Sequence, residues 1–392
     1  MQYRIDKKSG NKLSILGLGC MRLPGTMGRI DMPKAETLIM HAIEKGINFF
    51  DTAYLYPGSE VALGTVLEKN KVREKVYIGT KLPLFKCRSY EDFDNVFNEE
   101  LSRLRTDYID YYFMHNLSGL ADWERLCGLG VEKWIAGKKA DGKIRQVGFS
   151  FHGLKDEFTK LIDAYDWEFC MIQYNYININ YQAGRDGLKY AYSKDIPVFI
   201  MEPLLGGRLS NDLPPAALKM LEQSNPEASA ASWALRWLWH HTEPAVVLSG
   251  MSNMAQLEEN ITLASLSEPG CMSDDELAVV AKVADIFQDS YKIPCTGCNY
   301  CLPCPKGINI PDSFLSYNTS YTISRFAGIT QFATTSGGFS PTFSLYDCTR
   351  CGKCEKECPQ KIAIMERIVD VRKRMEPIWY RTAIKLARKV IR

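Results

Sequence analysis

Short apolar runs alternate with amphipathic helical stretches through roughly the first 290 residues of the chain. Eight of these runs are rich in Val, Ile, Phe and Tyr, which predicts buried strands. They are Ile15–Leu18, Ile47–Phe50, Val76–Gly79, Tyr108–Met114, Ile144–Phe149, Phe169–Gln173, Val198–Met201 and Ala245–Leu248. Because a helical pattern follows each strand, and about 250 residues suffice for eight such pairs, the sequence predicts an α/β fold with a closed (β/α)8 barrel, the TIM-barrel architecture.

The helical stretches place apolar residues three and four positions apart and carry capping signals at their ends. The first follows Asp31, has Pro33 in its first turn and stops at Gly46. The predicted helices are Met32–Lys45, Glu60–Lys69, Tyr90–Leu104, Trp123–Ala140, Leu154–Ala164, Gln182–Lys194, Glu227–His240 and Met254–Ser265. A hairpin of Tyr3–Ile5 and Leu13–Leu16 is expected to cover the barrel floor.

Past residue 290 the pattern changes to Cys, Pro and Gly, which indicates a domain boundary. We expect the barrel over residues 1–290, a small α+β unit over 291–370 and a basic helix over 371–392. The segment Pro305–Asp347 is too long for a plain loop and is expected to be partly helical.

Composition and net charge exclude few functional classes of protein. The 392 residues are 46% hydrophobic and 24% charged, with a net charge of +2, which gives no case for nucleic-acid binding. The N-terminus has no apolar signal core, so a cytoplasmic protein is expected. The basic C-terminal segment has two interpretations, a membrane-surface helix and a solvated helix, of which we favour the second.

Eight of the thirteen cysteines lie in two tight runs, each closed by a proline. The cysteines are Cys295, Cys298, Cys301 and Cys304 in the first run, and Cys348, Cys351, Cys354 and Cys358 in the second. The second run has the spacing C-x2-C-x2-C-x3-C-P of bacterial iron–sulfur sites, in which the fourth cysteine ligates the other cluster. Eight thiolates suffice for two [4Fe-4S] clusters, so we expect the chain to handle single electrons.

The crossed rule makes Cys358 the fourth ligand of the first run's cluster and Cys304 the fourth ligand of the second run's cluster. The first run departs from the usual spacing, because two residues instead of three precede Cys304. A pair of four-cysteine zinc sites is the alternative, since such sites also use C-x2-C pairs. The five scattered cysteines are expected to be buried free thiols.

Four polar residues follow three adjacent predicted strands: Asp51, Tyr56, Lys81 and His115. Active groups of such barrels lie at the carboxyl ends of the strands. A tyrosine of pKa ~10 is a weak acid near neutrality, but a neighbouring ammonium lowers that pKa and a carboxylate holds the ammonium in place. Singly these residues could be a helix cap, a surface charge or a core histidine; together they predict proton transfer to a carbonyl oxygen.

The motifs F-D-T-A-x-x-Y, G-T-K and D-Y-I-D-x-Y-x-x-H, the last ending at His115, resemble the signatures of the aldo-keto reductases. The cysteine-rich remainder is similar to the branch of that family with a C-terminal, ferredoxin-like iron–sulfur domain. The resemblance implies an oxidoreductase that reduces a carbonyl group or oxidises an alcohol. In it, Tyr56 would be the general acid, Lys81 the group that lowers its pKa, Asp51 the support of Lys81, and His115 the group that orients the carbonyl.

The resemblance also implies a nicotinamide cofactor, with Ser150 and Gln173 on its carboxamide. The residues implied to meet the pyrophosphate and the adenine are Pro203, Leu204, Gly206, Gly207, Leu209, Gly250, Ser252, Asn253, Glu259 and Asn260. The chain departs from the family at Phe151, where Asn is usual, and at Met201, where a tyrosine usually stacks on the nicotinamide. The segment after the eighth strand has no basic residue for a 2′-phosphate, a role that Arg208 could take.

Hydride transfer moves two electrons together, whereas each cluster accepts one. A flavin performs both kinds of step, so the barrel is expected to hold NAD(P)(H) or a flavin. The expected partners are a small carbonyl or alcohol substrate and a redox protein. The alternative is an electron-transfer or redox-sensor protein that uses the barrel only to bind a flavin or nicotinamide, against which the intact set of Asp51, Tyr56, Lys81 and His115 argues.

Overall fold

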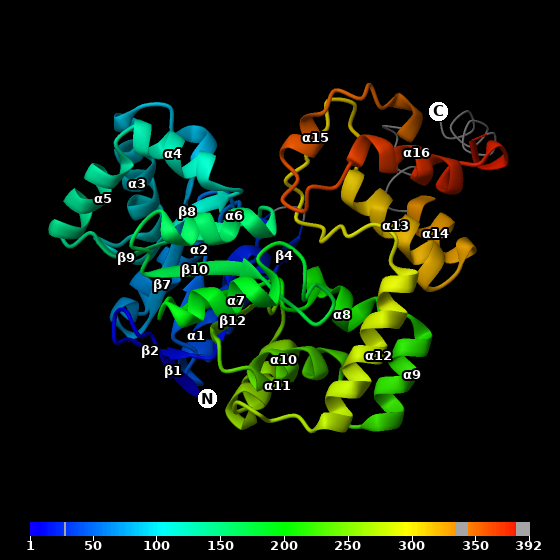
Figure 1. The fold of residues 1–392 in the computed structure, drawn as a ribbon, viewed down its shortest axis with the longest axis horizontal. Helices are drawn as coiled ribbons and strands as arrows, with labels where there is room; N and C mark the ends of the chain where they lie inside the picture. Colours follow the sequence, from blue (N-terminus) through cyan, green and yellow to red (C-terminus); the bar gives the residue numbers. More distant parts are fainter. Residues whose placement is uncertain (27–28, 334–343, 382–392) are drawn as a thin grey trace. The chain divides into compact units, whose positions relative to one another are not determined.

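The computed structural model describes residues 1–26, 29–333 and 344–381. Eight parallel strands close a barrel in the order β10-β11-β12-β3-β6-β7-β8-β9. They are β3 (Leu16–Gly19), β6 (Phe49–Asp51), β7 (Tyr77–Pro83), β8 (Ile109–Leu117), β9 (Ile144–Phe151), β10 (Phe169–Gln173), β11 (Val198–Met201) and β12 (Pro244–Ser249). Each predicted strand is present, and the predicted barrel is confirmed. Several of its strands, among them β8, β9 and β10, are labelled in Figure 1.

The chain packs as two compact units. The first consists of Met1–Pro203 and Ser232–Ser273, and the second of Leu204–Ala231 and Asp274–Arg392. The segment that follows β11 therefore packs with the C-terminal part of the chain, a division that differs from the expected one at residue 290.

Helices alternate with the barrel strands. Their bounds are α1 (Met32–Glu44), α2 (Ser59–Lys69), α3 (Tyr90–Leu104), α4 (Leu120–Gly128), α5 (Val131–Ala140), α6 (Lys155–Asp163), α7 (Gly184–Ser193), α10 (Ala230–His240) and α11 (Met254–Leu266). The single helix predicted over Trp123–Ala140 is wrong, because α4 ends at Gly128 and α5 starts anew after Gly130. Gly130 has φ 89°, a left-handed conformation that favours glycine and breaks the helix.

The floor of the barrel is a packed core. Phe49, Phe113, Phe169 and Phe199 come from four strands, and their rings lie in contact; the centroids of Phe113 and Phe169 are 4.6 Å apart. The predicted hairpin is present as β1 (Tyr3–Ile5) and β2 (Lys12–Ser14), but its second strand ends at Ser14, and Leu16 belongs to β3. The hydroxyl of Tyr111, at the start of β8, donates to Asp6 beside this hairpin over 2.8 Å. The interior is thus filled at this end, which leaves the carboxyl ends of the strands for chemistry.

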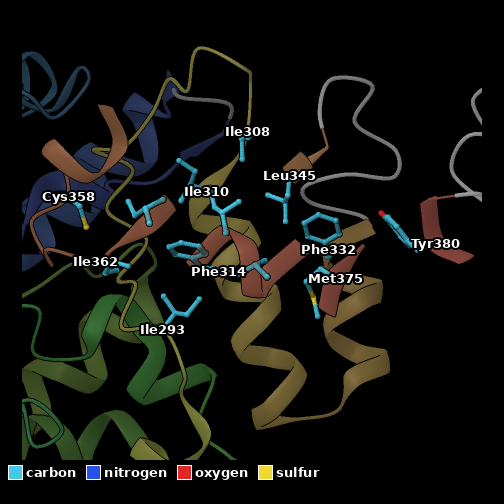
Figure 2. Packing of buried hydrophobic residues seen from close by; sticks show 13 residues of the cluster. Ile293, Ile308, Ile310, Phe314, Phe332, Leu345, Cys358, Ile362, Met375 and Tyr380 are labelled. Carbon is cyan, nitrogen blue, oxygen red and sulfur yellow. The ribbon is translucent and has the colours of Figure 1, made fainter. Parts of the chain in front are cut away.

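The described residues of the second unit form helices and loops, with no β-strand among them. The helices are α8 (Arg208–Asn211), α9 (Pro215–Ser224), α12 (Asp274–Ser290), α13 (Ile310–Thr322), α14 (Arg325–Phe332), α15 (Lys353–Lys356) and α16 (Ile364–Met375). Its apolar core includes Ile293, Phe314, Leu345 and Met375 (Figure 2). The predicted helical content of Pro305–Asp347 is confirmed by α13 and α14.

The expected C-terminal helix is described only in part. Residues 371–375 form the end of α16, and residues 382–392 lie outside the described residues. Within the described residues, no helix is both long enough and apolar enough to cross a lipid bilayer.

One half-buried histidine is expected to make the barrel sensitive to acid. His241 follows α10, its ring meets the edge of Trp237 at 4.7 Å between centroids, and burial chiefly lowers its pKa to about 4. The unfolded chain binds this proton near pH 6.5, so the free energy of unfolding falls as the pH drops from about 6.5 to about 4.

Between pH 7.5 and pH 5, His241 should cost the parent protein about 2 kcal/mol of its free energy of unfolding. We expect the His241→Gln variant to lack this part of the loss. Urea unfolding followed by tryptophan fluorescence at both pH values measures this loss. His41→Gln, at a partly exposed residue paired with Glu258, is the control. Equal losses in the parent and His241→Gln contradict the prediction.

Candidate active site and cysteine centre

A buried ion pair lies at the carboxyl ends of β6 and β7. The Nζ atom of Lys81 lies 2.6 Å from Oδ1 of Asp51, and it donates over 2.6 Å to the backbone carbonyl of Thr52. The side chains of Lys81 and Asp51 are 1% and 7% exposed. Strand pairing brings them together, because Asp51 is level with Gly79, two residues before Lys81.

Tyr56 and His115 complete the predicted group of four. The Nζ atom of Lys81 lies 4.9 Å from the ring centroid of Tyr56. The rings of Tyr56 and His115 are perpendicular, with their centroids 6.4 Å apart. The barrel therefore brings together a phenol, an ammonium, a carboxylate and an imidazole from β8 and the segments around β6 and β7.

Burial governs the charges of this group. Burial raises the pKa of Asp51 and lowers that of Lys81, and their mutual attraction opposes both shifts. The pKa of His115 lies well below its ordinary value. Burial is the main cause, and the positive charges of Lys81 and His152 add to it. His115 is therefore neutral near pH 7 and suited to orient a polar group by hydrogen bonding, while Lys81 provides the positive charge.

Removing Lys81 tests the pairing. We expect Lys81→Met to lower the free energy of unfolding by about 3–5 kcal/mol, because Asp51 then stays buried without its cation. Urea unfolding measures the loss. Adding Asp51→Leu should restore a large part of it, and Lys86→Met, at an exposed side chain, should cost little. The pairing is contradicted if Lys81→Met/Asp51→Leu loses as much free energy of unfolding as Lys81→Met and Asp51→Leu lose together as single variants.

Two buried carboxylates behind this group were not anticipated. Glu60 accepts from Thr80 over 2.6 Å and from Arg103 over 3.1 Å, and Glu100 accepts from Tyr112 over 2.7 Å. Burial raises the pKa of both carboxyls, and the proximity of Glu60 adds to the shift of Glu100. Glu60 also acts on Lys81 by raising its pKa, so it belongs to the electrostatic surroundings of the site.

The eight cysteines of the two runs line two cavities, and one of them, Cys301, lines both. One cavity is lined by Cys295, Cys298 and Cys301 of the first run together with Cys358 of the second. Figure 2 shows Cys358 on the side of the core that also holds Ile362. The grouping is the one that the crossed rule predicts for a cluster.

The other cavity takes its cysteines mainly from the second run. It is lined by Cys348, Cys351 and Cys354, and Cys304 of the first run joins them; Cys301 touches both cavities. Among the described residues, no three Cys, His, Asp or Glu side chains converge closely enough to hold a single metal ion.

Comparison with known proteins identifies both parts of the chain. Residues 15–278 match the model of the aldo/keto reductase family, and residues 294–363 match that of a 4Fe-4S dicluster domain. The chain belongs to the aldo/keto reductase family. Its C-terminal part is thus an iron–sulfur domain of the ferredoxin type, which the zinc alternative does not explain.

Similar proteins cover about three quarters of this chain and nearly all of their own length. L-galactose dehydrogenase of Arabidopsis thaliana is 28% identical over 313 residues, 73% of this chain and 95% of its own. The holo form of the aldo-keto reductase AKR11C1 from Bacillus halodurans is 25% identical, with a TM-score of 0.60 over 72% of this chain and 96% of its own. An aldo-keto reductase from Klebsiella pneumoniae in complex with NADPH shares the fold, with 20% identity and a TM-score of 0.58 over 72% of this chain and 95% of its own.

Gln173 is one of the residues predicted to contact a cofactor, and its side-chain amide is unpartnered. It ends β10, is fully buried, and both its amide oxygen and its amide nitrogen lack a hydrogen-bond partner. The hydroxyl of Ser150, on the neighbouring strand β9, accepts from the backbone N–H of Asn116 over 2.8 Å. An amide-bearing ring such as nicotinamide matches the paired donor and acceptor of Gln173.

The two departures from the family have different consequences. Phe151 packs its ring against Phe158 of α6, with centroids 5.0 Å apart, so it belongs to the core between strand and helix. Met201 lies level with Gln173 in the pairing of β10 and β11 and is partly buried. A thioether at this place provides a flexible apolar contact in place of an aromatic one.

The segment after β12 is held largely by its own contacts. Asn253 caps α11 by accepting from Gln256, and the backbone N–H of Ser252 donates to the side chain of Gln256 over 3.0 Å. Asn260 is buried and donates to Ser249 over 3.1 Å. Gly250 lies before this helix, and Glu259 is partly buried on it.

The segment after β11 forms a tight turn within the second unit. Gly206 and Gly207 have φ 69° and 95°, and the N–H groups of Gly207 and Leu209 both donate to the carbonyl of Leu204. Leu209 is fully buried, and Pro203 is the last residue of the first unit before this turn. Arg208 is paired with Asp212, so its guanidinium is already engaged.

Proposed function

We propose that this protein reduces a carbonyl group, or oxidises the corresponding alcohol, in its barrel and relays single electrons through two [4Fe-4S] clusters in its C-terminal domain. The observation that carries the first part is the placement of buried Lys81 between Asp51 and the ring of Tyr56. The observation that supports the second is the division of eight cysteines between two cavities. The cytoplasm remains the expected compartment.

The chain's own residues account for the proton. In the reduction, the hydroxyl of Tyr56 donates its proton to the carbonyl oxygen as negative charge develops there. The ammonium of Lys81 stabilises the resulting phenolate, and Asp51 holds that ammonium in position. Neutral His115 donates a hydrogen bond to the same oxygen and orients the carbonyl. Solvent returns the proton to Tyr56.

A nicotinamide matches the unpartnered side-chain amide of Gln173. Gln173 would hold the carboxamide through its unpartnered amide atoms, and Ser150 would contribute its hydroxyl. When bound, the nicotinamide supplies or accepts the hydride. The NADPH bound to the Klebsiella pneumoniae reductase supports this choice. Because clusters exchange one electron at a time, a flavin in the barrel is the second candidate.

We propose Cys295, Cys298, Cys301 and Cys358 as ligands of one cluster, and Cys304, Cys348, Cys351 and Cys354 as ligands of the other. Each cluster, when bound, accepts or donates one electron. Six of the eight cysteines belong to the apolar core of the second unit or pack against it: Cys295, Cys301, Cys304, Cys348, Cys354 and Cys358.

Anaerobic purification tests the proposal. The absorption spectrum and mass analysis of the released cofactor identify nicotinamide or flavin, and an activated aldehyde such as 4-nitrobenzaldehyde serves as the first substrate probe. We expect substrate-dependent oxidation of the cofactor and bleaching of the cluster absorption by dithionite. Recovery of NAD(P) alone, with clusters that never change redox state, would remove the relay but keep the reductase. A response to ligand without any turnover would favour the redox sensor.

A further inference from the structure

The two cysteine cavities differ in the charge of the residues around them. The lining of the Cys358 cavity contains no Lys, Arg, Asp or Glu side chain. The lining of the Cys351 cavity contains three cations, Lys306, Arg350 and Lys353, and no carboxylate. The lining of one cavity is thus apolar and uncharged, whereas the lining of the other includes positive side chains.

The cationic side is also the exposed side. Lys306, Arg350 and Lys353 are exposed, and within the described part of the chain no ion pair joins any of them to a carboxylate. Cys351 is the exposed cysteine among the eight, whereas Cys358 is buried. Carboxylates such as Glu357 are exposed nearby in the sequence but do not line the cavity. An unpaired cationic rim beside an exposed ligand suits contact with a negatively charged partner.

We propose that the surface formed by Lys306, Arg350, Cys351 and Lys353 is the docking site of an acidic one-electron carrier protein. This inference rests on the proposed relay and names its external partner. In each encounter the reduced carrier loses one electron and the cluster beside Cys351 gains one, with no bond made or broken. The cations accelerate the encounter by electrostatic steering, an effect that salt screens.

Charge reversal tests this surface. The variant Lys306→Glu/Arg350→Glu/Lys353→Glu is compared with Lys75→Glu/Lys133→Glu/Lys189→Glu, which makes the same change in net charge at exposed barrel positions. Stopped-flow absorption follows cluster reduction by an acidic flavodoxin, and by the methyl viologen radical cation as the probe of opposite charge. Iron content verifies that both variants carry their clusters.

We expect the surface variant to react at least tenfold more slowly with flavodoxin at low salt, and the difference to vanish at about 0.5 M salt. With the viologen cation the surface variant should be as fast as the parent or faster, and the barrel variant should match the parent with both probes. Equal slowing in the two triple variants, or none in either, overturns the docking site. Clusters that neither probe reduces overturn the relay itself.

A separate observation concerns Arg208 and the other cavity. Arg208 is 7% exposed; its guanidinium pairs with Asp212 over 2.9 Å, and its Nε atom has no hydrogen-bond partner. Its NH2 atom lies 3.7 Å from the place that a Cβ on Gly297 would occupy, in the loop between Cys295 and Cys298. Burial lowers the pKa of Arg208, but Tyr291, Asp212 and Cys295 raise it by more, so it stays a cation.

A hydroxyl lies in the same loop, next to Gly297. Thr296 lines the Cys358 cavity, is 3% exposed, and its Oγ1 atom is buried without a hydrogen-bond partner. Net charge and hydrogen bonds to sulfur set the potentials of iron–sulfur clusters. A buried cation and a hydroxyl donor at one cluster therefore favour its reduced, more negative state.

The geometry points to Arg208 as a positioning residue that raises the reduction potential of the cluster bound by Cys295, Cys298, Cys301 and Cys358. This second inference also rests on the proposed clusters. The segment that contains Arg208 follows β11 directly in the chain.

Redox titration followed by electron paramagnetic resonance tests the role of Arg208. We expect Arg208→Gln to lower the equilibrium constant for reduction of this cluster at least tenfold, 59 mV for one electron. Arg208→Lys should largely retain the parent potential, and Asp212→Asn, which removes the counter-charge, should shift it upwards. Arg350→Gln, at the other cavity, is the control.

A purely structural role of Arg208 predicts a different pattern. It would leave the potential unchanged in Arg208→Gln, or shift it in the same direction in Arg208→Gln and Asp212→Asn, and either result overturns the inference. If Arg208→Gln fails to assemble the cluster, Asp212→Asn provides the test: an upward shift of the reduction potential supports the inference, and no shift or a downward shift overturns it. Absence of any iron signal in the parent would instead contradict the proposed clusters.

Discussion

Replacing Tyr56 with phenylalanine is expected to lower kcat by about 10²- to 10⁴-fold and to leave cofactor affinity nearly unchanged. The substitution removes one oxygen atom and keeps the ring, so its contact with His115 and its position near Lys81 are retained. What is lost is the acid that protonates the carbonyl oxygen. Steady-state turnover of 4-nitrobenzaldehyde and fluorescence titration with NADPH measure the two quantities separately.

Tyr54→Phe is the matched control. Tyr54 lies two residues earlier in the same segment, but its hydroxyl donates to Glu99 over 2.6 Å and its ring faces Arg103 at 4.1 Å. It lacks the contact with Lys81 that defines Tyr56, so its removal should change kcat less than threefold. A Tyr56→Phe variant that keeps more than a tenth of the parent turnover contradicts the assignment, and equal losses in both variants point to a structural cause.

The strands could be predicted because each barrel strand is a short apolar run between helical patterns. Phe169–Gln173 and Val198–Met201 were predicted with the bounds that the structure has. The break between α4 and α5 was missed, because the apolar spacing continues through Gly130 and a lone glycine does not reveal its left-handed φ. Periodicity reports which face is buried, but not the backbone conformation at one residue.

The sequence predicted the active-site groups better than their surroundings. Asp51, Lys81 and His115 stand at strand ends, and parallel strands bring such residues together at one end of a barrel. Glu60 and Glu100 lie on helices, and both were missed because their hydrogen-bond partners, Thr80 and Tyr112, lie on the strands β7 and β8. A helical glutamate shows no sign in the sequence that it is buried.

Arg208 shows why a residue's role cannot be read from chain proximity alone. Its position after β11 made it a candidate for a cofactor phosphate, yet the structure pairs it with Asp212 and places it beside Gly297. The reason is that Leu204–Ala231 packs with the C-terminal part of the chain. An amphipathic pattern shows that a helix packs, but not which unit it packs against.

Double substitutions of the cysteines should establish which thiols share a cluster. We expect each single variant, Cys295→Ser, Cys304→Ser or Cys358→Ser, to lower the iron content from about eight to about four atoms per chain. If Cys358 belongs with the first run, Cys295→Ser/Cys358→Ser should lose no more iron than either single variant. Cys304→Ser/Cys358→Ser should lose nearly all of it, because that pair removes one ligand from each cluster.

The reason is that two substitutions in one cooperative unit are not additive, whereas substitutions in independent units are. Uncrossed ligation predicts the reverse: Cys295→Ser/Cys358→Ser would lose both clusters, and Cys348→Ser/Cys358→Ser only one. Cys170→Ser, at a buried barrel thiol far from both runs in the sequence, should keep all the iron. Iron and sulfide analysis of anaerobically purified protein separates the two patterns, and the crossed pattern requires Cys358 to remain beside Cys295 and Cys298 as it lies in the structure.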